Sequence, residues 1–424
     1  MSTELPTPLA LADGHLLQGV EAEAAARRGA HGHYAVHRVG ADGRHEFLRD
    51  PLGVHKRFFA CGADGQVHSS PLWHRLLAAG HAPEAVWSVP PGHRLVLDPA
   101  DGSLTAETVA ALPIAMEGAP DDEAPARIRT RLEAVFQAMA PALVGRPVYL
   151  ALSGGLDSSV IALHAARHLP GATAVTFAMG EPGTAEASED LETAGAVAAA
   201  LGLPFHTVIE EVDGVLGRME EALLHGQDFR DFNVHCALVN AALAAGIARH
   251  HAAAGGEEVP VVLTGDTMNE LTADYRAETY RGQEYYRLPR LPLPEVRRLL
   301  VVGLDAGDRE VGIFAAHGIE TVQPYALCPD AWTSMPPAML AREDAKQELV
   351  RTAYGGELPG LVFDRPKTRA QSGSADNSTG TLAACVDHGW DSAAVRARFA
   401  ALHGIDEAAL GGFIRGGRYR FRTT

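Results

Sequence analysis

The sequence contains few cysteines, and none of them forms a recognisable pair. Cys61, Cys236, Cys328 and Cys385 stand far apart, without a CxxC motif and without a histidine at zinc-binding spacing. The sequence therefore indicates neither a disulfide framework nor a zinc knuckle. We expect the four residues to be buried thiols that pack as small apolar side chains.

Positive charge is also scarce. The 424-residue sequence holds 36 Lys and Arg residues against 53 Asp and Glu residues, which gives a formal net charge of −17 at pH 7. Such an acidic surface argues against a nucleic-acid groove over most of the protein. A small-molecule substrate, with no nucleic-acid partner, is the expectation that follows.

Long apolar runs are missing as well. The N-terminal segment MSTELPTPLALADGH has no basic start, and no stretch of about 18 uncharged apolar residues occurs in the sequence. We therefore expect a soluble cytoplasmic protein without a membrane partner. A homodimer is the ordinary expectation for a soluble enzyme.

The composition that remains is that of a globular protein with two domains. Hydrophobic residues make up 46% and charged residues 21% of the chain, and 424 residues exceed one ordinary domain. Residues 1–116 contain short alternating runs with Asp-Gly turn signals, which predict β-hairpins in a small, mostly β domain. Residues 117–123 are rich in Pro, Gly and Asp and predict a linker. The second predicted domain comprises residues 124–424.

The second domain begins with a regular alternation of helices and strands. Helices are predicted at residues 124–143, 158–168, 189–201, 215–224 and 234–253, and strands at residues 148–152, 172–178, 205–209 and 259–263. This alternation predicts the α/β class, with a parallel sheet covered by helices on both faces. From Pro289 onward the pattern is mainly helical. The segment that contains Tyr275, Tyr280, Tyr285 and Tyr286 is either a lid or a helical surface.

The strongest motif is Ser153-Gly154-Gly155-Leu156-Asp157-Ser158-Ser159, which follows the predicted strand ending at Leu152. A strand that enters a helix through such a loop gathers backbone N–H groups, hydroxyls and a helix N-terminus around one point. That arrangement suits a pyrophosphate, and Asp157 is a candidate ligand for the accompanying Mg²⁺. The candidate ATP-binding residues are Leu152, Ser153, Gly154, Gly155, Leu156, Asp157, Ser158 and Ser159.

This motif resembles the pyrophosphate loop of the asparagine synthetase family, which includes the β-lactam synthetases. Further segments resemble family landmarks in the same order: residues 176–180, 264–271, 318–325 and 365–373. The resemblance covers about residues 125–385. It implies an ATP pyrophosphatase domain of the adenine-nucleotide α-hydrolase type, with ATP and Mg²⁺ as cofactors.

The resemblance also implies roles for individual residues. Phe177, Gly265 and Arg365 are expected at the nucleotide, and Lys367 is expected to balance charge at the α-phosphate as a catalytic residue. Asp266 takes the position of a residue that handles the substrate amine: a glutamate in asparagine synthetases and a tyrosine in β-lactam-forming relatives. Glu320 either faces the amine as a catalytic residue or is an ordinary ion-pair partner.

The second metal ligand departs from the family pattern. Asn269 stands where the family has a Mg²⁺-binding aspartate, and a neutral amide oxygen binds Mg²⁺ more weakly than a carboxylate. Three alternatives follow: Asn269 keeps the role, the adjacent Glu270 takes it, or Asp157 holds the ion with phosphate and water alone. Residues 227–235, with two carboxylates, an arginine and a histidine, either line the substrate pocket or cap a helix.

The N-terminal domain resembles the glutaminase domain of the family through residues 49–53 and 89–93. That domain uses a cysteine directly after the initiator methionine as its nucleophile, whereas this sequence has Ser2 and no cysteine before Cys61. The resemblance therefore implies a vestigial glutaminase-like scaffold without glutaminase activity.

The function expected from the sequence is that of an AMP-forming amide ligase that works without a glutaminase. It adenylates a small-molecule carboxylate and transfers the acyl group to ammonia or an amine, in specialised metabolism such as antibiotic biosynthesis. The alternatives are an intramolecular lactam synthetase and a non-catalytic nucleotide-binding scaffold. Sulfur insertion into tRNA is disfavoured because reactive cysteine pairs and a basic face are lacking.

Overall fold

The computed structural model describes residues 7–62, 64–112, 121–180, 188–275, 277–286, 288–306, 308–342, 344–364 and 380–410, and of residues 302–306 the backbone alone. Lys367 and Arg365 lie outside these ranges. So does most of the predicted linker at residues 117–123.

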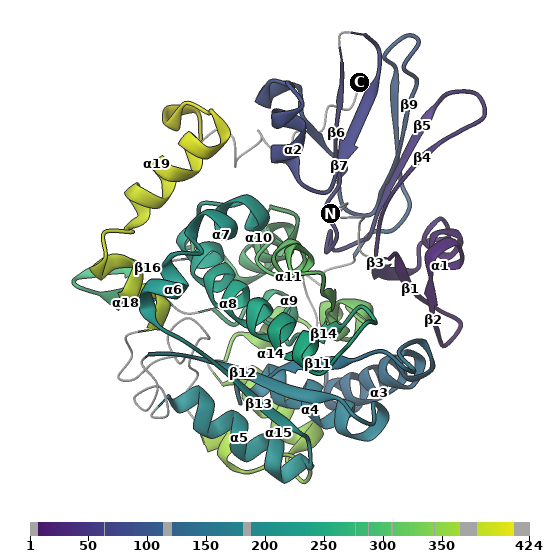
Figure 1. The fold of residues 1–424 in the computed structure, drawn as a ribbon. Helices are drawn as coiled ribbons and strands as arrows, with labels where there is room; N and C mark the ends of the chain where they lie inside the picture. The colour runs from purple at the N-terminus through teal and green to yellow at the C-terminus, as the bar shows by residue number, and fades with distance from the viewer. Residues whose placement is uncertain are drawn as a thin grey trace.

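A five-stranded parallel sheet forms the centre of the second part of the chain (Figure 1). Its order is β13-β12-β11-β14-β17, with bounds Phe205–Glu210, Thr173–Met179, Val148–Ala151, Val261–Leu263 and Glu320–Val322. β11 pairs in parallel with both β12 and β14. The chain therefore changes direction across the sheet at β11, and such a switch point is where open α/β sheets bind ligands.

The sheet buries both of its faces. Leu150, Val261 and Leu263 pack into one hydrophobic core, whereas Tyr149 and Val262, one position along the same strands, pack into another. This two-sided burial is expected for parallel strands because helical crossovers cover each face. The predicted α/β class is confirmed.

Helices from different parts of the chain supply the two cores. The first core receives α3 (Ala124–Ala142), α4 (Leu156–His168), α5 (Glu189–Leu201), α12 (Pro324–Leu327), α13 (Asp330–Thr333) and α15 (Ala345–Tyr354). The second receives α6 (Val212–Leu216), α7 (Met219–Gly226), α8 (Asp231–Ala253), α11 (Val311–Ala316), α18 (Gly380–Asp387) and α19 (Ser392–His403). The helix predicted at residues 215–224 is two helices, α6 and α7, with Gly217 between them. Glycine disfavours helix, which explains the break.

The remaining elements of the second part are short. They are α9 (Met268–Thr272), β15 (Glu278–Tyr280), β16 (Gln283–Tyr285), α10 (Leu293–Ala306), α14 (Pro337–Leu340), α16 (Leu361–Asp364) and a 3₁₀ turn at Glu407–Ala409. β15 and β16 form an antiparallel hairpin through Arg281 and Gly282, both at positive φ. The centre of the tyrosine-rich segment is therefore not a helical surface, since a two-residue turn of this kind closes a hairpin, and the lid alternative stays a prediction.

The N-terminal part is rich in β-strands, as predicted. Its three small sheets have the orders β2-β1-β3, β10-β9-β5-β4 and β7-β6-β8. The strands are β1 (Leu9–Ala12), β2 (His15–Gln18), β3 (His31–His33), β4 (Ala35–Val39), β5 (His45–Arg49), β6 (Phe58–Cys61), β7 (Val67–Ser70), β8 (Trp87–Ser88), β9 (His93–Leu97) and β10 (Leu104–Thr108), with helices α1 (Gly19–Ala26) and α2 (Trp73–Ala78) and a 3₁₀ turn at Pro83–Ala85. Domain boundaries at residues 116 and 124 stay a prediction.

The N-terminal part makes direct contacts with the second part. His33 on β3 accepts a hydrogen bond of 2.9 Å from the backbone N–H of Gln323, directly before α12. Trp73 on α2 stacks on His403 of α19, with ring centroids 4.5 Å apart. The N-terminal part therefore supports the start of α12, the helix that follows β17.

The structure also bears on two expectations from the sequence, the burial of the cysteines and the lack of a long apolar segment. Cys328 and Cys385 are buried as predicted, but Cys61 is exposed, because it is the last residue of β6 and faces outward. Among the described residues, α8 alone is long and apolar enough to cross a membrane. However, 67% of its apolar window is buried within the fold, as is usual for a core helix.

Candidate active site

The glycine loop joins the carboxyl end of β11 to α4. Gly154 has φ +74°, and a Cβ atom there would lie 2.6 Å from Cγ2 of Thr193 and 2.8 Å from the backbone nitrogen of Ala194 on α5. A side chain is excluded both by the left-handed backbone and by this close approach. Gly155 is the N-cap of α4 and has an ordinary φ of −71°.

The N-terminus of α4 is open to an anion. The first amide that bonds back into the helix is that of Ser159, at 3.0 Å from the carbonyl oxygen of Gly155. The amides of Leu156, Asp157 and Ser158 precede it, and they lie at the positive end of the helix dipole. The hydroxyls of Ser153 and Ser158 are 3.2 Å apart beside them. These groups form the type of N-terminal site that binds phosphate.

The segment after β14 packs directly on the first turn of α4. A Cβ atom on Gly265 would lie 2.9 Å from the amide nitrogen of Ser158 and 3.0 Å from the carbonyl carbon of Asp157. Tyr325 on α12 donates a hydrogen bond of 2.8 Å to the carbonyl oxygen of Asp157. The loop and the residues around Asp266 therefore belong to one site.

Lys346 holds the acidic side chains of this site together. Its Nζ lies 2.8 Å from Oδ1 of Asp157, 2.7 Å from Oδ1 of Asn269 and 2.8 Å from Oδ2 of Asp274. The side chain is only 7% exposed. Burial alone would lower the pKa of the Lys346 ammonium, but Asp157 and Asp274 reverse this effect and raise the pKa above its usual value. Lys346 is therefore a fixed positive charge at the loop.

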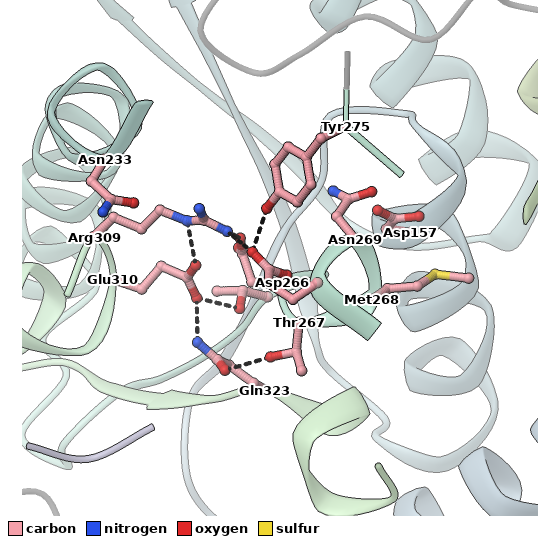
Figure 2. A network of polar contacts seen from close by, with 12 residues as sticks. Asp157, Asn233, Asp266, Thr267, Met268, Asn269, Tyr275, Arg309, Glu310 and Gln323 are labelled. Carbon is pink, nitrogen blue, oxygen red and sulfur yellow. Dashed lines mark hydrogen bonds and ion pairs between the residues drawn. The ribbon is translucent and has the colours of Figure 1, made fainter. Parts of the chain in front are cut away.

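The position of the Lys346 ammonium affects whether Asp157 and Asn269 can bind Mg²⁺. Figure 2 shows Asn269 beside Asp157, as the sequence predicted, but the oxygens of both side chains already contact Nζ of Lys346. A divalent cation between them would lie against a buried positive charge, which Coulomb repulsion opposes. The residues as arranged do not fit Mg²⁺ bound between Asp157 and Asn269.

Glu270 does not complete that metal site either. Its Oε1 is 2.8 Å from Nη2 of Arg309 and also accepts a hydrogen bond from the hydroxyl of Tyr275. Asn269 and Glu270 thus each contact a cationic side chain of the protein, Lys346 and Arg309 respectively. Glu270 belongs to a separate polar network and does not lie with Asp157 and Asn269 at Lys346, whereas the alternative in which Asp157 holds Mg²⁺ with phosphate and water stays a prediction.

Arg309 is the centre of that network (Figure 2). Its Nη2 lies 2.8 Å from Oδ1 of Asp266 as well as from Glu270, and its guanidinium carbon lies 4.7 Å above the ring of Phe232. One arginine fork is suited to bridge two carboxylates and to stack on an aromatic ring. Asp266 is the more exposed acid, with 30% of its side chain accessible against 5% for Glu270.

Glu310 approaches the network from the other side. Its Oε2 accepts hydrogen bonds from the hydroxyl of Thr264 at 2.9 Å and from Nε2 of Gln323 at 2.7 Å. Burial raises the pKa of the Glu310 carboxyl well above its usual range, and the neighbouring charge of Asp266 raises it further. Arg309, whose Nε lies 3.4 Å from Oε1 of Glu310, and the Thr264 hydroxyl partly oppose this rise in pKa.

The backbone next to Asp266 is strained. Thr267 has φ +83°, which a β-branched residue adopts only under constraint. Its hydroxyl donates a hydrogen bond of 2.8 Å to Oε1 of Gln323, the residue that also contacts Glu310. Such strain is held by the surrounding structure and is concentrated at functional sites.

Glu320 lies away from these groups. It is the first residue of β17, paired in register with Val261, and therefore stands at the amino end of the sheet, opposite the loop. Its Oε2 lies 2.7 Å from Nη1 of Arg146, and its Oε1 accepts a hydrogen bond from the hydroxyl of Thr7. The catalytic assignment of Glu320 is corrected: the side chain is an ion-pair partner, the second of the two sequence alternatives.

Two predicted nucleotide contacts are core residues. Phe177 on β12 is 5% exposed and Leu152 is 2% exposed, and they pack into the two hydrophobic cores. Their side chains therefore do not face the site, and a nucleotide can meet them only through the backbone. The roles of Arg365 and Lys367 stay predictions, because both residues lie outside the described part of the chain.

The charged segment at residues 227–235 serves the start of α8. Oδ1 of Asp228 accepts hydrogen bonds from the backbone N–H groups of Phe229 and Arg230, and Oδ2 accepts one of 2.6 Å from Asn233. Asp228 also pairs with the guanidinium of Arg230. These bonds lie in the turn before α8, whose N-cap residue Arg230 has no side-chain cap hydrogen bond, so the pocket and the capping alternatives both stay predictions. His235, further along the helix, contacts the Tyr286 hydroxyl at 2.7 Å.

Sequence reasoning missed Lys346, Arg309, Asp274 and Tyr325. A signal for Lys346 was present: the 36 Lys and Arg residues include three lysines, Lys56, Lys346 and Lys367. In so arginine-rich a chain, a lysine marks a position where a compact ammonium is needed. Lys346 also shares a helical face with apolar Leu349 and Val350, where a charge requires buried partners.

Comparison with known proteins defines the class of this site. Residues 132–309 match the sequence model of the family named Asparagine synthase. The matched segment carries the glycine loop, Asp266 and Arg309. It matches the ATP-pyrophosphatase-like part of that family, which implies ATP use. No curated protein matches the sequence.

Three similar solved structures are distant in sequence. An NH3-dependent NAD synthetase from Campylobacter jejuni is 20% identical, with a TM-score of 0.24, over 36% of this chain and 61% of its own. NMN synthetase from Francisella tularensis is 14% identical, with a TM-score of 0.32, over 71% and 98%. Glutamine-dependent NAD+ synthetase from Acinetobacter baumannii is 16% identical, with a TM-score of 0.31, over 76% and 48%. This chain thus spans less than two thirds of the first and third.

Proposed function

We propose that this chain is an ATP-dependent amide ligase. A carboxylate oxygen of the substrate attacks the α-phosphorus of ATP, pyrophosphate leaves, and an acyl adenylate forms. An amine then attacks the acyl carbon, and AMP leaves with the electrons of the C–O bond. The observation that carries this proposal is the packing of Gly265 on the first turn of α4, which places the glycine loop and Asp266 in one site.

In the first step the loop holds the pyrophosphate. The amides at the start of α4 and the hydroxyls of Ser153 and Ser158 are donors for its oxygens. Lys346 supplies a positive charge beside them. Such preorganised charge favours the transition state, in which negative charge moves onto the leaving group. Lys367 and Arg365 are proposed to contribute at the α-phosphate.

In the second step Asp266 handles the amine. Arg309 fixes its carboxylate, and the accessible 30% of its side chain leaves room for an ammonium. We propose that Asp266 orients the amine and accepts the proton that the amine loses on attack. Glu310, whose pKa is raised by burial and by Asp266, is proposed to share a proton with Asp266, and Glu270 keeps Arg309 in place.

The remaining features of the proposed reaction are its metal ion, its second substrate and its biological setting. No step is routed through Mg²⁺, because Lys346 contacts the two predicted ligands. Ammonia or a metabolite amine is the proposed second substrate. A role in specialised metabolism such as antibiotic biosynthesis, a cytoplasmic location and a homodimer remain part of the proposal.

A lactam synthetase is the second candidate. The sequence counted against it because Asp266 replaces a tyrosine, yet the hydroxyl of Tyr275 donates to Glu270 within the same network. A phenol is therefore available beside the amine-handling acids. In that reaction the carboxylate and the amine belong to one molecule. A non-catalytic nucleotide-binding scaffold has no comparable observation in its favour.

Pyrophosphate exchange tests the proposal. Purified protein is incubated with ATP, labelled pyrophosphate and a panel of carboxylic acids and amino acids, in the presence and absence of Mg²⁺. We expect carboxylate-dependent exchange, a loss of at least 100-fold in Asp157→Ala, and no loss in Asp213→Ala, a matched variant at a distant acid. Absence of exchange over the whole panel, with ATP binding unchanged in Asp157→Ala, would contradict a ligase.

A second variant separates the two steps. Asp266→Asn should keep carboxylate-dependent exchange but lose amide formation by at least 100-fold when the amine is added. Equal loss of both reactions would remove Asp266 from the amine step. Amide formation from a single substrate that carries both groups, without an added amine, would favour the lactam alternative.

A further inference from the structure

A cluster of metal-binding side chains lies outside the candidate active site. Glu133 on α3 and His164 and His168 on α4 bring one carboxylate and two imidazoles together, with their ligand atoms all within 4.8 Å of one another. Oε2 of Glu133 lies 3.2 Å from Nδ1 of His164, and Oε1 lies 2.7 Å from Nε2 of His168. The two histidines are four residues apart, so they share one face of the helix.

The two ring nitrogens that face Glu133, Nδ1 of His164 and Nε2 of His168, are buried. His164 has 0% exposed side chain, and its buried Nδ1 has no hydrogen-bond partner; the same is true of Nε2 of His168. Both nitrogens face the carboxylate of Glu133, so that the three groups converge on one point. Tetrahedral ligand atoms around Zn²⁺ stand about 3.3 Å apart, given bond lengths near 2.1 Å. The distance of 3.2 Å between Glu133 and His164 is close to that spacing, whereas the distance of 2.7 Å between Glu133 and His168 is shorter.

The surroundings complete the resemblance to a metal centre. The other ring nitrogen of His164, Nε2, lies 3.1 Å from the hydroxyl of Tyr354 on α15. Gln137 donates a hydrogen bond of 3.1 Å to Oε1 of Glu133. Metal-binding histidines and carboxylates are usually held by such outer contacts, which fix the ring and the tautomer.

We propose that Glu133, His164 and His168 bind one Zn²⁺ ion between α3 and α4. Two imidazoles and a carboxylate are a donor set that suits this ion. Glu133 and His168 are partly exposed, at 34% and 19%, so solvent reaches the site and supplies the fourth ligand.

The position of the ion gives it a role for the active site. α4 and α15 contact each other at two places: Asp157 meets Lys346 near one end, and His164 meets Tyr354 further along. These contacts are about 10 Å apart along each helix at 1.5 Å per residue. An ion on His164 and His168 therefore fixes α4 against α3, and through Tyr354 it fixes α15, which carries Lys346.

Metal titration tests this site without reference to any ligase activity. The full chain, freed of metal by a chelator, is titrated with Zn²⁺ by calorimetry and with Co²⁺ by visible absorption. We expect one ion per chain at micromolar affinity or tighter, with a tetrahedral Co²⁺ spectrum. His168→Ala and Glu133→Gln, both at partly exposed positions, should weaken binding at least tenfold. Tyr354→Phe should weaken it by a smaller factor.

The matched control is His250→Ala. His250 packs against His206 with tilted rings whose centroids are 4.2 Å apart, which makes it part of another histidine pair, and its loss should leave the high-affinity ion in place. Metal-free His168→Ala should have the same circular dichroism as the metal-free parent, which excludes misfolding. Equal Zn²⁺ affinity in His168→Ala and the parent, or no saturable binding by the parent, would overturn the proposal.

Discussion

Nζ of Lys346 lies 2.8 Å from Oδ1 of Asp157, so a lysine of α15 neutralises the acid in the first turn of α4. The same ammonium contacts Oδ1 of Asn269 at 2.7 Å, and a neutral amide suffices there because Lys346 already has Asp157 and Asp274 as anionic partners. Asn269 stands where the family has a metal-binding aspartate. In this structure its amide oxygen contacts the Lys346 ammonium, a cation that the protein itself supplies.

Lys346→Met should destabilise the fold and impair the loop. It leaves Asp157 and Asp274 without their cation, and breaking a buried ion pair costs about 3 kcal/mol. Urea unfolding should show this loss, whereas Arg351→Met, on an exposed face of the same helix, should cost about 0.5 kcal/mol. Added Mg²⁺ should restore stability to Lys346→Met but not change the parent. A parent that is itself strongly stabilised by Mg²⁺ would contradict the arrangement.

Asn269→Asp should create a demand for Mg²⁺. A third carboxylate beside Lys346 changes the formal charge of the cluster from −1, for Lys346 with Asp157 and Asp274, to −2, which favours binding of a hard divalent cation. ATP binding, measured by calorimetry with and without Mg²⁺, should tighten at least tenfold with the ion in this variant. The increase should be smaller in the parent. Identical Mg²⁺ dependence in the two proteins would show that position 269 does not face the cation.

The two glycines of the loop should differ in their tolerance of alanine. Gly154→Ala meets Thr193 at 2.6 Å and forces a side chain into φ +74°, so we expect a loss of about 2 kcal/mol or more in unfolding free energy. Gly155→Ala has an ordinary φ and only the Ser153 hydroxyl at 3.4 Å. It should cost less than about 1 kcal/mol. Equal costs for the two variants would mean that the loop does not pack on α5 as described.

Glu310→Gln should flatten the dependence of stability on pH. The pKa of Glu310 is raised above its usual 4.5 by burial and by Asp266, so the folded protein keeps a proton that the unfolded chain releases above that pH. The unfolding free energy therefore falls as pH rises, by up to about 1.4 kcal/mol per unit. Glutamine mimics the protonated acid and removes this loss.

The prediction for Glu310 is tested by urea unfolding at three pH values, about 5, 6.5 and 8, because the unfolding free energy depends on pH where the folded and unfolded states bind different numbers of protons. The difference between Glu310→Gln and the parent should grow in favour of the variant as pH rises. Glu278→Gln, at a partly exposed strand position, should follow the parent. Parallel profiles for all three proteins would show that Glu310 is ionised in the fold.

Local patterns in the sequence determined much of the fold. The helix predicted at residues 189–201 has the bounds of α5, since Ser188 caps it and Gly202 ends it in the left-handed conformation. The glycine loop between β11 and α4 was equally readable, because strand, turn and helix signals follow one another along the chain. These features depend on neighbours a few residues away.

The composition of the site was decided by the tertiary structure. Lys346 and Asp157 are 189 positions apart, and no periodicity links them; only the packing of α15 on α4 brings them together. Glu320 shows the converse, because it lies in a recognisable segment but at the amino end of a parallel strand, opposite the loop. The sequence by itself determined the elements and the nucleotide loop. Which charges meet at that loop depends on the directions of strands and the docking of helices, and these are set by burial of the two cores.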